Sequence, residues 1–71
     1  MTTGQRIKKL REEKKMSMHD LANATNLDVS YISYLEAGKR NNPTVETLVA
    51  IAKVFGVEAW FLLKNDEGLD G

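Results

Sequence analysis

The stretch that decides the fold runs from residue 17 to residue 43, SMHDLANATNLDVSYISYLEAGKRNNP, within a chain of 71 residues. It holds two short segments that open with helix-capping residue types, Ser17 and Asp28, and only a few residues separate them. Asn26 can adopt the left-handed conformation that ends a helix, and Gly38 supplies the next stop. This pattern predicts two short helices joined by a tight turn and followed by a basic, amide-rich loop.

The second of these predicted helices carries a small and largely uncharged outer face. Ile32 and Leu35 lie three residues apart and mark its inner edge. At 100° per residue, the side chains that point away from this edge include Ser30, Ser33 and Tyr34. Such a face suits insertion between two negatively charged DNA strands. The alternative interpretation is that the serines are ordinary exposed helix residues and that the tyrosines only pack.

Three further helices and almost no strand are predicted around this pair. Thr2 and Gln5 have the spacing of a capping box at the start of a helix over about residues 3–14. A longer helix is predicted where apolar residues recur at helical spacing: Val45, Leu48, Ile51, Ala52 and Phe55. A short fifth helix over residues 57–63 follows.

The expected fold is therefore all-α: a compact five-helix domain in which the second and third helices form a helix-turn-helix. We expect the domain to cover residues 1–64 and a flexible C-terminal tail to cover residues 65–71. A chain of 71 residues leaves room for one small domain with a modest core, so dimerisation is expected to add stability.

Composition excludes several classes of function. The chain has no cysteine, which excludes disulfides and cysteine-ligated metal. Its only histidine is His19, and it has no Gly-rich phosphate loop, so we expect neither an enzyme nor a metal or cofactor site. No apolar run approaches the roughly 20 residues that span a bilayer, and no signal peptide follows the N-terminus. We expect a soluble, cytoplasmic protein with no membrane partner.

A formal net charge of zero hides a polarised chain. Residues 1–40 hold eight Lys or Arg against five Asp or Glu, whereas residues 41–71 hold two against five. The positive half contains the predicted helix pair, as expected for a DNA-binding surface. The alternative is that the basic residues near the N-terminus only solvate a helix: Lys8, Lys9, Lys14 and Lys15.

From Arg6 to Leu63, about four-fifths of its length, the chain resembles the helix-turn-helix domain of the lambda repressor and Cro-like family, also called the xenobiotic response element family. The matching features, in order, are Leu21-Ala22, Tyr31-Ile32-Ser33, Leu35-Glu36, Gly38-Lys39-Arg40, Asn42-Pro43, Glu46-Thr47-Leu48, Ile51-Ala52 and Gly56-Val57. The turn and third helix also resemble the controller proteins of restriction-modification systems. Phage-type repressors and antitoxins share the same fold.

The resemblance implies a domain that binds DNA as a dimer and regulates transcription, with a recognition helix over about residues 28–37 in the major groove. By position it assigns base contacts to Val29, Ser30, Ser33 and Tyr34. None of these is Arg, Asn or Gln, so the bidentate hydrogen bonds that read guanine or adenine are missing. Readout should then depend on methyl contacts, water and DNA shape.

Phosphate contacts are expected from the loop after the recognition helix and from the start of the second helix. In the loop the candidates are Lys39, Arg40, Asn41 and Asn42. Where the family commonly has a glutamine that touches phosphate, this chain has Met18. The predicted phosphate contacts at this helix start are Ser17, Met18 and His19, and we expect Ser17 or His19 to take the place of the missing glutamine side chain.

The resemblance also implies an ion pair between Arg11 of the first helix and Glu36 of the third. We expect this pair to fix the orientation of the recognition helix. Its net contribution to stability should be small, because two charges must be removed from water, but loss of one partner should be costly.

The apolar run at the end of the domain, Trp60, Phe61, Leu62 and Leu63, cannot all face the core from one short helix. The alternative interpretation is that the aromatic pair closes the core, which we expect for at least one of Trp60, Phe61 and Leu63. We expect part of the surface assigned to Trp60, Phe61 and Leu63 to contact a second subunit. A two-fold dimer would separate the recognition helices by about 34 to 36 Å, which matches half-sites one helical turn apart.

These features together predict a sequence-specific regulator of transcription, a repressor, that binds double-stranded DNA as a homodimer on a palindromic operator. The alternative is an antitoxin or adaptor that acts through protein contacts, with a toxin, a polymerase or a C-terminal sensor domain as its partner. The basic loop beside the exposed serines favours the DNA-binding interpretation, because it suits phosphate better than a protein surface.

Overall fold

The computed structural model describes residues 1–39 and 43–63. These residues form five helices and no strand: α1 (Thr3–Glu13), α2 (Met18–Thr25), α3 (Val29–Glu36), α4 (Val45–Phe55) and α5 (Ala59–Leu63). The predicted all-α, five-helix fold is confirmed. The predicted tail over residues 65–71 lies outside the described residues. None of the described helices has the length and apolar character that crossing a membrane requires.

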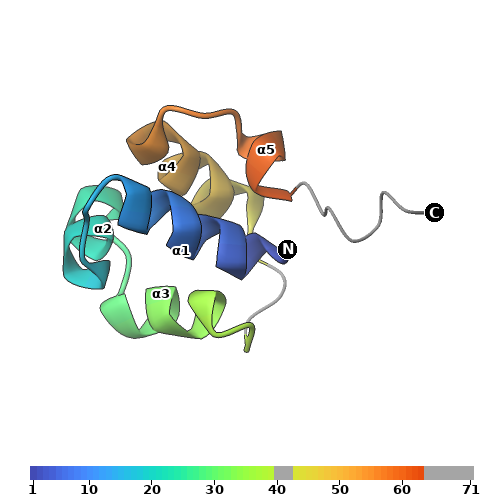
Figure 1. Cartoon of the computed structure of the whole chain (residues 1–71). Helices are drawn as coiled ribbons and strands as arrows, with labels where there is room; N and C mark the ends of the chain where they lie inside the picture. Colours follow the sequence, from blue (N-terminus) through green and yellow to red (C-terminus); the bar gives the residue numbers. More distant parts are fainter. Residues whose placement is uncertain (40–42, 64–71) are drawn as a thin grey trace.

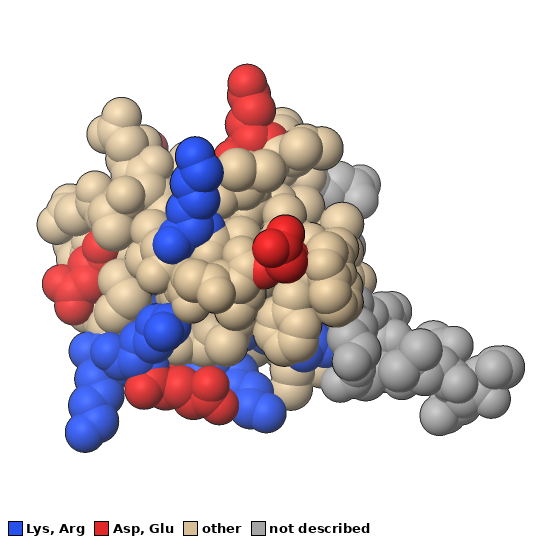
Figure 2. All heavy atoms as spheres, turned by 90° about the horizontal axis from the view of Figure 1, so that it is seen from above, with Lys and Arg blue, Asp and Glu red and all other residues tan. Residues whose placement is uncertain are grey.

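α1 runs through the middle of the molecule, between α3 on one side and α4 and α5 on the other (Figure 1). α3 lies along one edge, whereas α4 and α5 lie on the opposite side of α1 (Figure 1). Seen from the α4 and α5 side, uncharged residues cover most of the surface, most of the visible Lys and Arg side chains lie at one edge, and the other charged side chains stand separately over the face (Figure 2).

Each helix contributes at least one residue to a single core. The largest fully buried side chains come from all five elements: Ile7, Leu21, Ile32, Leu35, Ile51 and Leu62. The predicted apolar stripe of α4 is buried at four of its five positions, but Val45 is 74% exposed. Val45 is the first residue of the helix and lies roughly 70° around it from the centre of the buried stripe, which takes it out of the core.

Two capping boxes start the first two helices, as predicted. The hydroxyl oxygen of Ser17 accepts from the backbone N–H of Asp20 at 2.9 Å, and the Asp20 carboxylate accepts from the backbone N–H of Ser17 at 2.9 Å. This second bond lowers the pKa of Asp20 below its usual value. Thr2 and Gln5 form the equivalent pair in front of α1.

The predicted cap at Asp28 is wrong in its chemistry but right in its position. Asp28 is the residue before α3, yet its side chain makes no capping hydrogen bond. The first turn is closed by the backbone, where the N–H of Ile32 donates to the Asp28 carbonyl at 3.1 Å. Packing of Val29 and Ile32 against the core then holds the start of the helix.

Gly4 lets α1 approach the end of α3 more closely than any other residue would allow. A Cβ atom at this position would lie 1.8 Å from the carbonyl oxygen of Leu35 and 2.8 Å from its carbonyl carbon. Both are backbone atoms, so no side-chain rotation can relieve the overlap. The spacing between α1 and α3 therefore requires glycine here.

We expect Gly4→Ala to destabilise the fold by about 2–3 kcal/mol, because α1 must move away from α3 to accommodate one methyl group. Urea denaturation of the variant and the parent would measure this loss. Lys8→Ala, on the exposed side of the same helix, is the matched control and should change stability by less than about 0.5 kcal/mol. Equal stabilities of Gly4→Ala and the control would contradict the close approach.

Candidate nucleic-acid interface

α2 and α3 are joined by a turn that depends on one left-handed residue. Asn26 follows α2 with φ 61°, as predicted for an asparagine that ends a helix. The backbone N–H of Leu27 then donates to the carbonyl of Ala22 at 3.0 Å, which closes the turn. Ala22 is 5% exposed within the core, so there is little room for a larger side chain on this helix.

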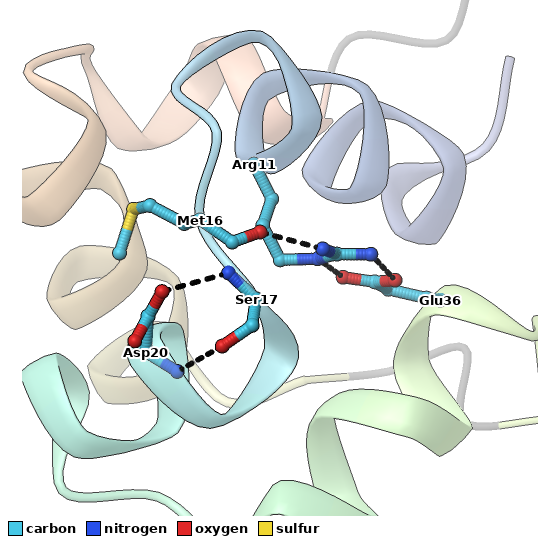
Figure 3. A network of polar contacts seen from close by, with 5 residues as sticks. All are labelled: Arg11, Met16, Ser17, Asp20 and Glu36. Atoms are coloured by element: carbon cyan, nitrogen blue, oxygen red, sulfur yellow. Dashed lines mark hydrogen bonds and ion pairs between the residues drawn. The ribbon is translucent and has the colours of Figure 1, made fainter.

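One guanidinium connects α1 to both helices of this pair (Figure 3). Arg11 Nε donates to Oε2 of Glu36 at 2.7 Å, and Arg11 Nη2 donates to Oε1 of Glu36 at 2.9 Å. The third nitrogen, Nη1, donates to the carbonyl oxygen of Met16 at 2.7 Å, just before α2. The guanidinium therefore holds the C-terminal end of α3 and the N-terminal approach to α2 at the same time.

The burial of the Arg11–Glu36 ion pair restricts its geometry. The side chains of Arg11 and Glu36 are 9% and 3% exposed. The hydrogen bond to Glu36 raises the pKa of Arg11 above its usual value, so the guanidinium stays charged. A bidentate pair fixes direction as well as distance, because both nitrogens must face both oxygens in one plane. The pair therefore sets how α3 is rotated and tilted against α1.

The outer face of α3 is open to solvent along two neighbouring rows. Ser30 is exposed, and Tyr34, one turn later, is 47% exposed. Val29 and Ser33 form the second row and are half-buried. Tyr31 packs against the core instead. The structure thus groups the four predicted base-contacting residues on one side of a rigidly held helix.

Among the predicted phosphate contacts after α3, only Lys39 lies within the described residues. Gly38 has φ 80°, which turns the chain away from the helix, and the backbone N–H of Lys39 donates to the Tyr34 carbonyl at 2.9 Å. The Lys39 side chain is exposed. The other three predicted contacts, Arg40, Asn41 and Asn42, lie outside the described residues.

The start of α2 offers fewer groups to an anion than expected. The Met18 side chain packs against the core, so a contact from this residue would have to use its backbone N–H. Ser17 uses its hydroxyl oxygen as the cap acceptor but keeps its O–H as a donor. His19 is exposed. The Asp20 carboxylate lies at the same helix end and places a negative charge beside these donors.

At α5 the structure divides the predicted dimer residues into two kinds. Trp60 is 64% exposed and Leu63 is 55% exposed, whereas Leu62 is fully buried and closes the core. Phe61 is half-buried, and its ring lies 4.9 Å from the guanidinium carbon of Arg6. The rings of Trp60 and Phe61 meet edge to face at 6.2 Å. Trp60 and Leu63 form the exposed α5 patch.

Three features of this region were absent from the sequence-based expectations. They are the carbonyl of Met16 as a partner of Arg11, the close contact of Gly4 with Leu35, and the buried Arg6 over Phe61. The first two involve backbone atoms, which no side-chain pattern reports. For Arg6 the sequence holds only a weak indication of burial, because this residue directly precedes Ile7 in the most buried part of α1.

A pair of short helices held by a third, with the second helix open along its outer face, is the architecture of helix-turn-helix DNA-binding domains. The chain belongs to the helix-turn-helix family, whose sequence model matches residues 7–59. This is a family of DNA-binding transcriptional regulators and not of enzymes. The resemblance to lambda-repressor-like domains is confirmed.

The most similar proteins include repressors and regulators. The chain is 43% identical over 58 residues to the immunity repressor protein of Bacillus phage phi105, which covers 82% of this chain and 40% of the relative. The biofilm regulator SinR in complex with DNA has a TM-score of 0.86 and 35% identity, covering 89% of this chain and all of that one. The P22 c2 repressor with a synthetic operator has a TM-score of 0.85 and 27% identity, covering 93% and 98%. The chain spans 40 to 63% of the length of the curated relatives that it matches.

We expect the Arg11–Glu36 pair to show strong coupling in a double-mutant cycle. Arg11→Ala and Glu36→Ala should each cost about 3–5 kcal/mol, because each leaves a buried charge without its partner. The double variant should lose at least about 1 kcal/mol less than the sum of the single losses. Urea denaturation of the four proteins gives the coupling directly.

Two further variants define the source of this coupling. Arg11→Lys keeps the charge but cannot form two parallel bonds to Glu36 and a third to Met16, so it should recover only a minor part of the loss. Glu12→Ala, on the exposed side of α1, should change stability by less than about 0.5 kcal/mol. Strictly additive losses in the cycle would refute the orienting role of the pair.

Proposed function

We propose that this chain is a sequence-specific regulator of transcription, a repressor, that binds a palindromic operator as a homodimer and places α3 of each copy in the major groove. The observation that carries the proposal is the open outer face of α3 on a helix whose orientation is fixed by buried hydrogen bonds at its C-terminal end. The phage phi105 relative is named a repressor, and the SinR and P22 c2 structures are complexes with DNA.

In the proposed complex, Ser30 and Tyr34 reach furthest into the groove, because they are the exposed members of the four candidates. Val29 and Ser33 lie at the edge of the contact, where Val29 can meet a thymine methyl group and Ser33 can donate to a base edge or a phosphate. These side chains give modest discrimination at each base pair. Operator choice then rests largely on DNA shape and on the symmetry of two half-sites.

Affinity in this proposal comes mostly from phosphate contacts next to α3. Lys39 is an exposed cation just after α3, and the other predicted contacts, Arg40, Asn41 and Asn42, follow it in the sequence. On the other side of the helix pair, Ser17, His19 and the backbone N–H of Met18 contact the phosphate strand. The Asp20 carboxylate weakens that second contact by charge repulsion, which places more of the affinity on the loop.

The exposed α5 patch supplies the proposed dimer contact. An exposed indole next to an exposed leucine is an apolar surface that a two-fold partner can cover with the same residues. Phe61 packs against Trp60 of this patch through an edge-to-face ring contact. Because α5 and α3 lie on opposite sides of α1 (Figure 1), the contact leaves the outer face of α3 free for DNA.

The salt dependence of DNA binding tests the phosphate contacts. We expect Lys39→Gln to weaken binding at low salt and to reduce the slope of log K against log salt by about one unit, since one counterion fewer is released. Fluorescence anisotropy with a labelled duplex at several salt concentrations measures both. Lys9→Gln is the matched control, because Lys9 lies near Phe61 on the α5 side of α1 and its loss should leave the slope unchanged. An unchanged slope for Lys39→Gln would remove this residue from the interface.

Selection from a random duplex library tests the operator and the dimer together. We expect a recovered palindrome with half-site centres about 34 to 36 Å apart, one turn of DNA. Trp60→Ala should then weaken dimerisation and binding to the full palindrome by at least about tenfold while leaving single half-site binding unchanged. Analytical ultracentrifugation that finds only monomer, both free and with the palindrome, would defeat the dimer proposal.

A further inference from the structure

The outer side of α4 is a second apolar surface that the proposed DNA and α5 contacts do not use. A groove of about 570 Å³ runs along this helix and against the end of α2, where Ala24 and Thr25 line it. We name its α4 residues the α4 face: Val45, Glu46, Val49, Ala50, Lys53 and Val54. Val45 is 74% and Val49 is 37% exposed, so two β-branched apolar side chains of α4 face solvent.

The α4 face has a symmetric order of charges. Glu46 and Lys53 lie seven residues apart, near the middle line of the face, and the pair of Val49 and Ala50 lies halfway between them. Seven residues correspond to two turns and a rise of about 10.5 Å along the helix. This distance is too long for Glu46 and Lys53 of one chain to form an ion pair with each other.

Neither charge has a side-chain partner among the described residues, although Glu46 lies in the first turn of α4 and Lys53 in its last turn, where the helix dipole favours them. In the part of the structure that is described, Glu46 and Lys53 are exposed, and neither forms a salt bridge or a side-chain hydrogen bond. The end of α2 that borders the groove adds only small side chains, Ala24 and Thr25, so another helix can approach without obstruction. The face is therefore a shallow apolar strip with one unpaired negative end and one unpaired positive end.

A second copy of the same helix fits this strip when it lies antiparallel across a two-fold axis at Val49 and Ala50. In that arrangement Glu46 of each copy faces Lys53 of the other, so two ion pairs form at once. By the same symmetry Val49 of each copy faces Ala50 of the other beside the axis, where the small alanine side chain allows close packing of the two helices. A parallel arrangement would instead place like charges opposite each other.

We propose that the α4 face binds the α4 face of a second copy in this antiparallel manner. The contact goes beyond the proposed operator dimer, because it uses a different helix and leaves both the α5 patch and the outer face of α3 uncovered. Its effect is to join copies that already pair through α5, so that neighbouring operators are occupied together. α4 lies on the side of α1 opposite α3, which keeps the contact clear of bound DNA (Figure 1).

Charge reversal at two positions tests the contact. Glu46→Lys gives a face with two positive residues, and Lys53→Glu gives a face with two negative residues, so each variant alone should lose association through the α4 face while keeping the proposed α5 pair. An equimolar mixture of the two should associate, because opposite faces then meet, and the double variant Glu46→Lys/Lys53→Glu should associate as the parent does. Sedimentation equilibrium of the full chain should show at least about a tenfold weaker association for each single variant.

Matched variants on α1 control for net charge. Lys8→Glu and Glu12→Lys make the same changes on exposed positions outside the α4 face, so neither their separate nor their mixed samples should differ from the parent in association. Circular dichroism melts establish that all variants fold. Val49→Asp, at the proposed axis, should abolish the contact in every combination while remaining folded, since its side chain is partly exposed.

The outcomes separate this proposal from the operator dimer. Trp60→Ala should leave the association of the charge-reversed mixture intact, and the α4 variants should leave binding to a single DNA half-site unchanged. A mixture that associates no better than its separate components, or single variants that associate as the parent does, would overturn the α4 contact without touching the proposed DNA binding. Loss of DNA binding in the parent would overturn the proposed function and leave the α4 result valid.

Discussion

The buried guanidinium of Arg11 is the interaction on which the candidate DNA-binding surface depends. It donates to Glu36 at the end of α3 and to the backbone at Met16 before α2, so one side chain on α1 orients both helices of the pair. Gly4 brings the same helix against the carbonyl of Leu35, next to Glu36, and so limits how far α3 can move. The outer face of α3 carries small, uncharged side chains that make weak contacts. Such contacts are lost after a small displacement, so α3 can recognise DNA only if its position is fixed.

The fold could be predicted from local features because they are short-range: capping boxes at Thr2 and Ser17, the left-handed residue Asn26, and helical spacing of apolar residues. The same reasoning was wrong where tertiary packing decides. Val45 belongs to the periodic pattern but lies outside the core, and Asp28 marks the start of α3 without capping it. The grouping of Ser30 and Tyr34 on one face was predictable from 100° per residue, whereas the contacts of Arg11 with Met16 and of Gly4 with Leu35 were not, since backbone atoms leave no trace in a residue pattern.

α4 carries more apolar residues than its contact with the core requires, and this excess is the basis for the proposed contact between copies. A helix that only covers a core needs one apolar stripe, and here that stripe is Leu48, Ile51, Ala52 and Phe55. Val45 and Val49, on the other side of the helix, are exposed and do not belong to the buried core of one copy. Because the net charge of the chain is zero, the proposed contacts with DNA and with other copies depend on the local arrangement of charges and not on overall charge.

The position of Arg6 and Arg11 on one helix has a consequence for the DNA itself. Five residues separate them, which is about 140° around α1, so Arg6 contacts Phe61 of α5 while Arg11 contacts Glu36 of α3. In the proposed dimer, the α5 patch and the recognition helix are therefore fixed to opposite sides of a single short helix with no hinge between them. One base pair added between the half-sites rotates them by about 34° relative to each other. Because the connection is rigid, the two recognition helices cannot rotate by the same angle to match them. Binding of the dimer should accordingly depend on the spacing of the half-sites to within a single base pair, and the stiffness of α1 sets how much deviation is accepted.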